Sequence, residues 1–515
     1  MAKFDKLTRR EFLAAASVTA VAAAAGERTG PGPAPLVAMP NRSAPLLELS
    51  AVQAVRSMAA GEMSAERYAQ ALLARCAEQK VLNAFITLEP DRVLEDARAA
   101  DRRRAAGAAL GALHGLPIPV KDSLNTRDYP TTAGTPALRR FRPQQNAPLV
   151  EALVNAGAIV LGKTNLHELS YGWTSNNLAF GAVRNPYDPA RIPGGSSGGT
   201  AAAVASRMAP LGVAEDTEGS IRVPAALCGI AGFRPTTGRY STEGAVPISS
   251  LFDQAGPHAR TVADLALFDS VAAGDHRAVA PASLKGVRLA VARGYFFAGL
   301  DAQVERLAEA ALAKLRGAGA EIVEADVPEL EQLIDLITDQ VQNHDVRIEL
   351  PRYLEAYHAG VRFEDVVAQA SADIRATFER YVLPGGSDFV PEATYRAAVD
   401  VHLPKLKRIF RDYFARTGAA AMVFPATMVT APRIGEDVEL RVRGQSVRFD
   451  VAVARNIAPG STAGLPGLVL PAGIADDGLP VALEFDGPAA SDRALLALGL
   501  AVEGVLGPIA PPRAR

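Results

Sequence analysis

The sequence of 515 residues is poor in cysteine and lysine and has no long hydrophobic run. Its two cysteines, Cys76 and Cys228, stand among apolar residues, which excludes a disulfide framework and a cysteine-ligated metal site and predicts two small buried side chains. No run reaches the roughly 18 uninterrupted apolar residues of a membrane-spanning helix, so no membrane span is expected. Only nine of the 54 basic residues are lysines, so each lysine is a candidate for a specific role.

The chain also lacks an excess of charge of either sign. Its 54 basic and 56 acidic residues leave a formal net charge of −2, and both signs are scattered along the sequence. A protein that binds the phosphate backbone needs a basic patch or stripe, so nucleic acid is not an expected partner. With 49% hydrophobic and 21% charged residues, the composition is that of a soluble globular protein that can bury a large core.

Residues 1–25 have the pattern of an export signal. A basic segment with Arg9-Arg10 precedes a largely apolar run over 12–25, which is too short to span a bilayer. The sequence Thr8-Arg-Arg-Glu-Phe-Leu13 resembles the twin-arginine (Tat) signal, which carries folded proteins out of the bacterial cytoplasm. We therefore expect the Tat machinery to export the precursor, with cleavage after about residue 25, to a periplasmic or secreted location.

Beyond the signal, residues 26–46 are rich in Gly, Pro and Ala and are predicted to form a tether. Apolar periodicity predicts helices over 51–60, 65–78 and 91–106, with Ser50 and Ser64 as N-caps of the first two. From residue 116 onward, short apolar runs alternate with segments of helical length, which indicates an α/β layered core. The expected strands are 116–120, 158–161, 211–214, 287–292, 320–323 and 468–470, and the expected helices include 149–156, 200–207, 302–316 and 494–506.

One large domain is expected over residues 47–515, because no linker follows residue 46. Its interval 327–418 is mostly helical in pattern. We interpret this interval as an insertion that either packs on the core or forms a cap over a pocket.

Two motif matches are rejected on physical grounds. The segment 157–164 fits the phosphate-loop pattern G-x-x-x-x-G-K-T, but its variable residues, Ala-Ile-Val-Leu, favour a strand over a small-residue loop. The segment 194–198 fits the G-x-S-x-G nucleophile elbow, but the stretch 185–193 before it holds three prolines and cannot be a central strand. We therefore expect neither a nucleotide-binding loop nor an α/β-hydrolase triad.

Three segments together carry a more specific pattern. They are Gly115-Leu-Pro-Ile-Pro-Val-Lys121-Asp122, Pro193-Gly-Gly-Ser196-Ser197-Gly-Gly-Thr200 and Glu215-Asp216-Thr217-Glu218-Gly219-Ser220-Ile221-Arg222-Val-Pro224. They resemble the amidase signature family of serine hydrolases, and the resemblance extends from about residue 50 to the C-terminus, with serines 24 residues apart as in the family. The resemblance implies an α/β fold with a large mixed β-sheet core flanked by helices on both faces, and hydrolysis of an amide C–N bond.

The resemblance also implies three catalytic roles. Ser220 would be the nucleophile that forms an acyl-enzyme, Ser196 the bridging serine and Lys121 the base. A lysine acts as a base near neutral pH only when its pKa is lowered, and the apolar run 116–120 would place Lys121 in surroundings that disfavour its charge.

Other residues of the same segments are expected to support this triad. In the family the bridging serine follows a cis peptide bond, and Gly194 and Gly195 have no side chains to clash there, while Ser197 follows the bridging serine. Asp216 and Arg222 flank the turn with the nucleophile, and we expect them to form an ion pair.

The oxyanion hole is expected to consist of backbone N–H groups at a helix N-terminus, where a negative charge is favoured. The expected donors are Thr217, Glu218, Gly219 and Ser220, in the turn before a helix that begins near Ile221. The sequence departs from the common family pattern at Glu218, where most members have glycine. A carboxylate beside the oxyanion hole repels anions, so a neutral amide is the expected substrate.

The substrate class follows from a closer resemblance to the indoleacetamide and mandelamide hydrolase branch. It is carried by Phe233-Arg-Pro-Thr-Thr-Gly-Arg-Tyr240 and Ala458-Pro-Gly-Ser-Thr-Ala-Gly-Leu-Pro-Gly467. The resemblance implies a small-molecule arylacetamide-type substrate that yields the acid and ammonia. Two alternatives stay open: an amidase-fold subunit of an amidotransferase, which the export signal opposes, and a hydrolase of arylamides or peptide amides.

No cofactor and no metal site are expected. His167-Glu168 is followed by Leu-Ser-Tyr and so does not form the H-E-x-x-H pattern of a zinc hydrolase. A packed or turn histidine is the better interpretation for both His114 and His167. The oligomeric state stays open, with a homodimer among the alternatives.

Replacement of both Arg9 and Arg10 by lysine is expected to leave the full-length precursor in the cytoplasm, because the transport machinery recognises the arginine pair and not its charge alone. Immunoblots of cytoplasmic and periplasmic fractions measure this, with Lys6→Arg as the charge-conserving control. Export of the double variant at the level of the unaltered chain would contradict the assignment.

Overall fold

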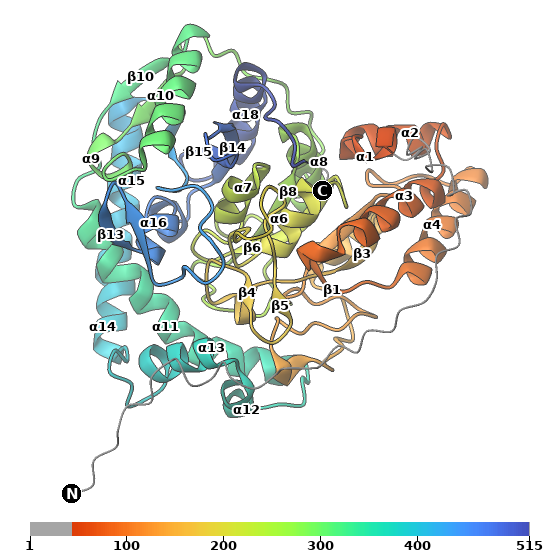
Figure 1. The fold of residues 1–515 in the computed structure, drawn as a ribbon, viewed down its shortest axis with the longest axis horizontal. Coiled ribbons are helices and arrows are strands. Elements are labelled where there is room, and N and C mark those ends of the chain that lie inside the picture. Colours follow the sequence, from red (N-terminus) through yellow and green to blue (C-terminus); the bar gives the residue numbers. More distant parts are fainter. Residues whose placement is uncertain (1–43, 514–515) are drawn as a thin grey trace, which may run out of the picture. The chain divides into compact units, whose positions relative to one another are not determined.

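The computed structural model describes residues 44–513, whose central feature is an 11-stranded mixed β-sheet (Figure 1). The strands are, in spatial order, β1 (Phe85–Thr87), β3 (Ile159–Thr164), β2 (Pro117–Lys121), β6 (Leu211–Asp216), β8 (Gln254–Ala259), β7 (Ala231–Arg234), β14 (Gly467–Ile474), β15 (Pro480–Asp486), β11 (Ala421–Pro425), β9 (Arg288–Val291) and β10 (Glu321–Glu324). Strands β3, β2 and β6 are parallel, and so are β11, β9 and β10, while the strands between these two groups pair in antiparallel fashion. The predicted α/β core with a mixed sheet is therefore confirmed.

Helices cover both faces of this sheet, as predicted. Adjacent residues of a strand point to opposite faces, and in β14 the side chain of Leu468 lies against Gly499 of α18 (Asp492–Leu506). The next residue, Val469, belongs to a separate buried cluster with Val223 and Ala225 of α7 (Arg222–Cys228). Helices α8 (Val262–Ala272) and α10 (Ala302–Gly317) pack with α18, and α6 (Gly198–Ala205) packs with α7.

The N-terminal helices form where capping and periodicity predict them. They are α2 (Ala51–Ala60), α3 (Ala65–Glu78) and α4 (Pro90–Ala105), and α5 (Pro148–Asn155) follows between β2 and β3. The Ser50 hydroxyl accepts a hydrogen bond from the N–H of Gln53 at 3.2 Å, and that of Ser64 accepts one from the N–H of Arg67 at 3.1 Å. Both predicted N-caps are therefore present.

The predicted tether over 26–46 is wrong at its C-terminal end. A short helix, α1 (Ala44–Leu47), already begins there. Leu47 is buried in the main core and Leu46 packs against it. Leu46 and Leu47 are more apolar than the Gly/Pro/Ala-rich stretch before them, and burial of their side chains favours an ordered helix. The rest of the tether and the export signal lie outside the described residues.

The interval 327–418 is mostly helical, as predicted. It contains α11 (Leu330–Ala356), α12 (Phe363–Gln369), α13 (Ala372–Thr377), α14 (Glu392–Ala397) and α15 (Leu403–Thr417), with π-helical turns at Phe378–Val382 and Ala398–His402. Figure 1 shows α11, α12 and α13 along the lower edge of the view. Leu350 and Leu354 of α11 form a buried cluster with Phe141 and Leu169, which packs this interval against the loops that follow β2 and β3.

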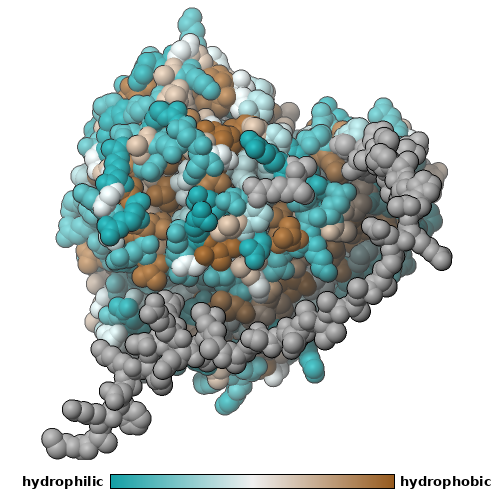
Figure 2. Space-filling model, viewed as in Figure 1, coloured by the Kyte–Doolittle hydropathy of each residue, from teal (hydrophilic) through white to brown (hydrophobic). Residues whose placement is uncertain are grey.

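The remaining elements are short. They are β4 (Asn176–Asn177), β5 (Gly181–Ala182), α9 (Arg293–Phe296), β12 (Glu439–Val442), β13 (Gln445–Arg448), α16 (Phe449–Ala454) and α17 (Ala458–Ala463), with 3-10 turns at Lys80–Leu82, Pro136–Leu138 and Glu168–Ser170. Polar side chains cover much of the face drawn in Figure 2, with apolar residues between them. Within residues 44–513, no helix is both long enough and apolar enough to cross a bilayer.

The apparent phosphate loop over 157–164 is largely strand β3, as its composition indicates. Its lysine, Lys163, is fully buried and lies 3.1 Å from Asp122 Oδ1. Its amine also donates to the carbonyl of Leu124 at 2.9 Å. These internal partners leave the lysine no part in binding a phosphate. Cys76 and Cys228 are both buried and unpaired, as expected.

Candidate active site

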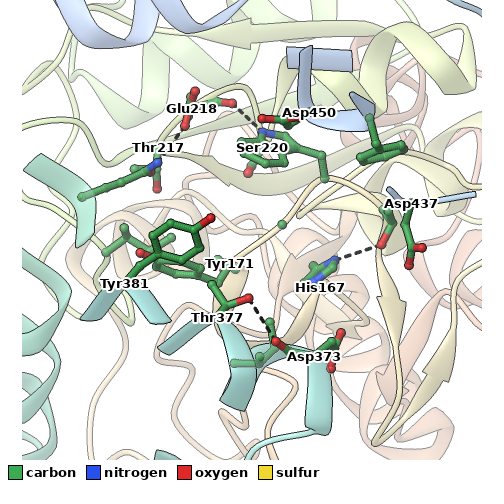
Figure 3. Close-up of a pocket in the computed structure, with 18 of the residues that line it drawn as sticks. His167, Tyr171, Thr217, Glu218, Ser220, Asp373, Thr377, Tyr381, Asp437 and Asp450 are labelled. Atoms are coloured by element: carbon green, nitrogen blue, oxygen red, sulfur yellow. Dashed lines mark hydrogen bonds between the residues drawn. The ribbon is translucent and has the colours of Figure 1, made fainter. Parts of the chain in front are cut away.

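A cavity of about 400 Å³ opens where the loops after β3 and β6 meet α11 and α13 (Figure 3). In this view Thr217, Glu218 and Ser220 lie along the top of the cavity and Asp373 and Thr377 along the bottom. The segment around β13 and α16 contributes Arg448, Phe449 and Asp450 to its wall. The predicted nucleophile therefore lines this cavity, and the helical interval 327–418 forms part of the cavity wall.

Lys121 ends strand β2 and is completely buried. Its Nζ lies 2.6 Å from Ser196 Oγ and 2.8 Å from Glu215 Oε2. Burial lowers the pKa of Lys121 below its ordinary value, while the carboxylates of Glu215, Asp216 and Asp253 act in the opposite direction. A buried lysine amine in contact with a serine hydroxyl is the arrangement that proton transfer from that hydroxyl requires.

Ser196 lies in the loop before α6 and is also fully buried. The Gly195–Ser196 peptide bond is cis. The Ser196 carbonyl accepts hydrogen bonds from the N–H of His167 at 3.0 Å and from Ser175 Oγ at 3.1 Å. Gly194 has φ +84°, and a Cβ there would come within 2.9 Å of Pro224 Cα, so the close approach of this loop to α7 requires glycine.

Ser220 lies in the turn between β6 and α7, with its side chain at the cavity wall. Its carbonyl accepts a hydrogen bond from the N–H of Ser197 at 3.3 Å, which ties the two serine segments together. Ser197 Oγ also donates to the carbonyl of Glu215 at 3.0 Å. Ser220 thus faces the cavity, while Ser196 and Lys121 lie behind the cavity wall without exposure.

The carboxylate of Asp216 stabilises the turn that contains Ser220. This carboxylate accepts hydrogen bonds from the N–H of Ile221 at 2.9 Å and from Arg222 Nε at 3.1 Å, so the expected ion pair is present. Arg234 Nε lies 3.4 Å from Oδ1 of the same carboxylate. Burial alone would raise the pKa of Asp216, but Arg222 and Arg234 hold that pKa well below its usual range.

One predicted oxyanion donor, Gly219, is wrong, because its N–H already donates to the Asp216 carboxylate. The N–H of Gly219 donates to Asp216 Oδ1 at 2.7 Å. This N–H therefore stabilises the turn and is not free for a substrate oxygen. Thr217, Glu218 and Ser220 remain as candidate donors. The prediction failed at Gly219 because a sequence pattern places N–H groups in a turn without showing which acceptor each one meets.

Arg222 connects the turn to distant parts of the fold. Its guanidinium donates to Glu484 Oε1 of β15 at 2.5 Å, to the carbonyl of Ile457 at 3.2 Å, and to the hydroxyl of Ser461 in α17. Arg222, Asp216 and Glu484 are all fully buried. The turn is thus held by an ionic network that reaches the antiparallel half of the sheet.

The charged side chains of the cavity wall are mostly acidic. Its carboxylates are Glu218, Asp339, Asp373, Asp437 and Asp450. Within the described residues, Arg448 is the only arginine or lysine of this wall, and it pairs with Asp450. Apart from Glu218, which was recognised in the turn, these acidic residues come from segments far along the chain with no motif of their own, so the sequence offered no signal for them.

Glu218 and His167, which the sequence analysis singled out, both line the cavity wall. Glu218 accepts a hydrogen bond from Gln342 Nε2 of α11 at 2.9 Å, and burial raises its pKa well above the ordinary value, reinforced by Asp339. His167 pairs through Nδ1 with Thr174 Oγ1 at 3.0 Å, and burial lowers its pKa to about 4. His167 is therefore neutral near pH 7, a packed histidine at the cavity edge.

Comparison with known proteins identifies a family for this chain. The family described as Amidase matches residues 67–496. The chain is 39% identical to an indoleacetamide hydrolase of Agrobacterium vitis over 88% of this chain and 96% of that one. It is 36% identical to a mandelamide hydrolase of Pseudomonas putida over 93% of this chain and 95% of that one. A solved peptide amidase from Stenotrophomonas maltophilia superimposes with a TM-score of 0.75 at 29% identity, covering 91% of this chain and 99% of that one.

Arg222→Met is expected to lower the free energy of unfolding by about 3–5 kcal/mol, because it leaves the buried Asp216 and Glu484 carboxylates short of positive charge. Denaturant unfolding measures the change. The control is Arg306→Met, which removes an exposed pair with Asp476 whose side chains are 55% and 78% accessible, and should cost less than about 1 kcal/mol. Equal effects of the two substitutions would contradict a structural role for the buried network.

Proposed function

The chain belongs to the amidase family and is a hydrolase of amide C–N bonds, and we propose that it converts a small neutral arylacetamide-type amide to the carboxylic acid and ammonia through Ser220, Ser196 and Lys121. The proposed mechanism rests on the 2.6 Å contact between the buried Lys121 Nζ and Ser196 Oγ. The segment of Ser196 is tied to the turn of Ser220 by the 3.3 Å hydrogen bond from the N–H of Ser197 to the carbonyl of Ser220.

In the proposed reaction, Ser220 Oγ attacks the amide carbonyl carbon and its proton passes to Ser196, whose own proton passes to Lys121. The C–N bond then breaks as Lys121 returns a proton through Ser196 to the leaving nitrogen, and ammonia departs. Water then attacks the acyl ester and its proton passes through Ser196 to Lys121. The ester C–O bond breaks as Lys121 returns the proton through Ser196 to Ser220 Oγ, and the carboxylic acid departs. The burial of Lys121 supports its role as base, because burial favours the neutral amine with its free electron pair.

The oxyanion that forms during attack is proposed to be held by backbone N–H groups of Thr217, Glu218 and Ser220. These groups precede α7 in a turn that the Asp216 carboxylate fixes through two hydrogen bonds. Donors held in place before the reaction stabilise developing negative charge without reorganisation.

Aromatic side chains in the cavity wall support an aryl substrate. Tyr171, Trp173, Tyr381 and Phe449 all line it. Trp173 is fixed by a hydrogen bond from its Nε1 to the carbonyl of Glu218 at 2.9 Å. Aromatic walls with a few polar groups are typical of sites for small aromatic ligands, and the acidic wall favours an uncharged substrate over an anionic one.

The export signal leads us to propose a periplasmic or secreted location for this hydrolysis. That location also disfavours the amidotransferase alternative, since charged tRNA is cytoplasmic.

The mechanism predicts that Ser220→Ala and Lys121→Ala each lower kcat/KM for phenylacetamide or indoleacetamide by at least about 1000-fold, because each removes a partner of the same proton-transfer chain. Ser196→Ala should be similarly impaired. Ammonia release from a panel of arylacetamides, arylamides and peptide amides measures activity and ranks the substrate classes, and circular dichroism checks folding. Retained turnover in folded Ser220→Ala would overturn the mechanism, and a preference for peptide amides would overturn the substrate class.

The acidic wall predicts discrimination by substrate charge. We expect phenylacetamide to exceed its para-carboxylate analogue in kcat/KM by at least about 10-fold, because the anion meets several wall carboxylates. Asp373→Asn should reduce the ratio of the two kcat/KM values, whereas Asp91→Asn, at an exposed position away from the cavity, should leave that ratio unchanged. Equal kcat/KM values for the two substrates would contradict the prediction that the wall carboxylates disfavour an anionic substrate.

A further inference from the structure

Glu215 makes a contact with the proposed base that the mechanism above does not use. It precedes Asp216 at the end of β6, and its side chain is 2% accessible. Its Oε2 lies 2.8 Å from Lys121 Nζ and accepts a hydrogen bond from Ser170 Oγ at 3.1 Å. Its Oε1 accepts one from Thr217 Oγ1 at 3.2 Å. The carboxylate is therefore held by two hydroxyl groups while it contacts the lysine amine.

We infer that Glu215 is a positioning residue for Lys121: its fixed carboxylate aims Nζ at Ser196 and stabilises the ammonium that forms when Lys121 takes up a proton. This inference rests on the proposed role of Lys121 as base. It assigns to Glu215 the task that a buried carboxylate performs for the general base of other hydrolytic triads, namely orientation and charge stabilisation.

The other acidic groups near Lys121 are already compensated. Asp216 is neutralised by Arg222 and Arg234, which both contact its carboxylate. Asp253 Oδ1 lies 2.7 Å from Thr217 Oγ1, and its Oδ2 accepts a hydrogen bond from the N–H of Ile248 at 2.9 Å. Burial, together with the charge of Glu215, raises the pKa of Asp253 well above its ordinary value, which favours the protonated form.

The basic groups that face this region also leave the pair undisturbed. Burial lowers the pKa of both His167 and His258 to about 4, so both are neutral near pH 7. Lys163 on the neighbouring strand β3 is paired with Asp122. Glu215 is therefore the carboxylate whose charge acts most directly on Lys121.

In the proposed step, Ser196 takes the proton of Ser220 as its own O–H bond breaks and an N–H bond forms on Lys121 Nζ. The amine thereby becomes an ammonium beside the Glu215 carboxylate. Glu215 neither gains nor loses a proton. The same carboxylate also holds the resting proton on Lys121 more tightly, so the base becomes available only at a higher pH than burial alone would allow.

Two effects are therefore expected for Glu215→Gln. The acidic limb of the pH profile of kcat/KM should move to lower pH by at least about one unit, because the lysine loses its anionic partner. The plateau value of kcat should fall by at least about 10-fold, because the ammonium formed in the reaction loses its counter-charge. KM should change little, since Glu215 does not line the cavity.

Asp264→Asn, in α8, is the matched control. It removes a fully buried carboxyl that accepts a hydrogen bond from the N–H of Val52 and is not among the groups that act on Lys121, so the acidic limb should stay within about half a unit of that of the unaltered chain. An unmoved limb in folded Glu215→Gln, or a plateau kcat equal to that of the unaltered chain, would contradict the inference. A variant that only disturbs packing lowers activity without moving the limb.

Glu215→Asp provides a second test if the glutamine variant does not fold. Its shorter side chain keeps the negative charge but no longer holds Lys121 Nζ toward Ser196. The acidic limb of the pH profile should therefore stay near its original pH while the plateau value of kcat falls. An unchanged plateau kcat would refute the positioning role. Lys121→Ala, measured in parallel, separates the two proposals. If it retains activity, the proposed function fails; if it is inactive while Glu215→Gln keeps the original profile, only the role of Glu215 fails.

Discussion

The site depends on one interaction, the contact of a lysine amine with a serine hydroxyl in the interior of the protein. Lys121 reaches Ser196 because β2 ends beside β6 and the glycine-rich loop before α6 turns back against both strands. Burial disfavours the lysine charge, and only an enclosed position provides that effect. A large sheet covered on both faces provides such a position, while the turn that follows β6 places Ser220 at an open cavity.

Ionic pairs complete this arrangement at some energetic cost. Buried charges are tolerated when each finds partners, and Asp216, Arg222 and Glu484 form such a set beneath the turn with Ser220. Lys163 and Asp122 form a second pair on the neighbouring strands, and Lys121 and Glu215 a third. The first two hold the backbone of the site in place. The third involves the proposed base itself, so it bears on chemistry as well as on structure.

The sequence predicted the α/β core and the residues of the signature segments, because both leave local patterns: apolar runs of strand length, capping serines and a lysine at a strand end. It did not predict the acidic wall, since Asp339, Asp373 and Asp450 come from segments that meet only in the folded chain. It misassigned the N–H of Gly219, because the choice between Asp216 and a substrate oxygen is made by tertiary geometry. Glu215 lies in a signature segment, but the sequence indicates no role for it, because its contact with Lys121 joins residues 94 positions apart.

Titration of Lys121 itself tests most directly whether its amine can act as the base, and the scarcity of lysine in the chain makes this titration practical. Selectively labelled lysine amines can be followed by nuclear magnetic resonance from about pH 6 to 11, with Lys121→Met to assign the signal. The account predicts that Lys121 loses its proton at a lower pH than the exposed lysines, so that the neutral amine is present where the enzyme is active. A Lys121 signal that remains an ammonium throughout the active pH range would contradict it.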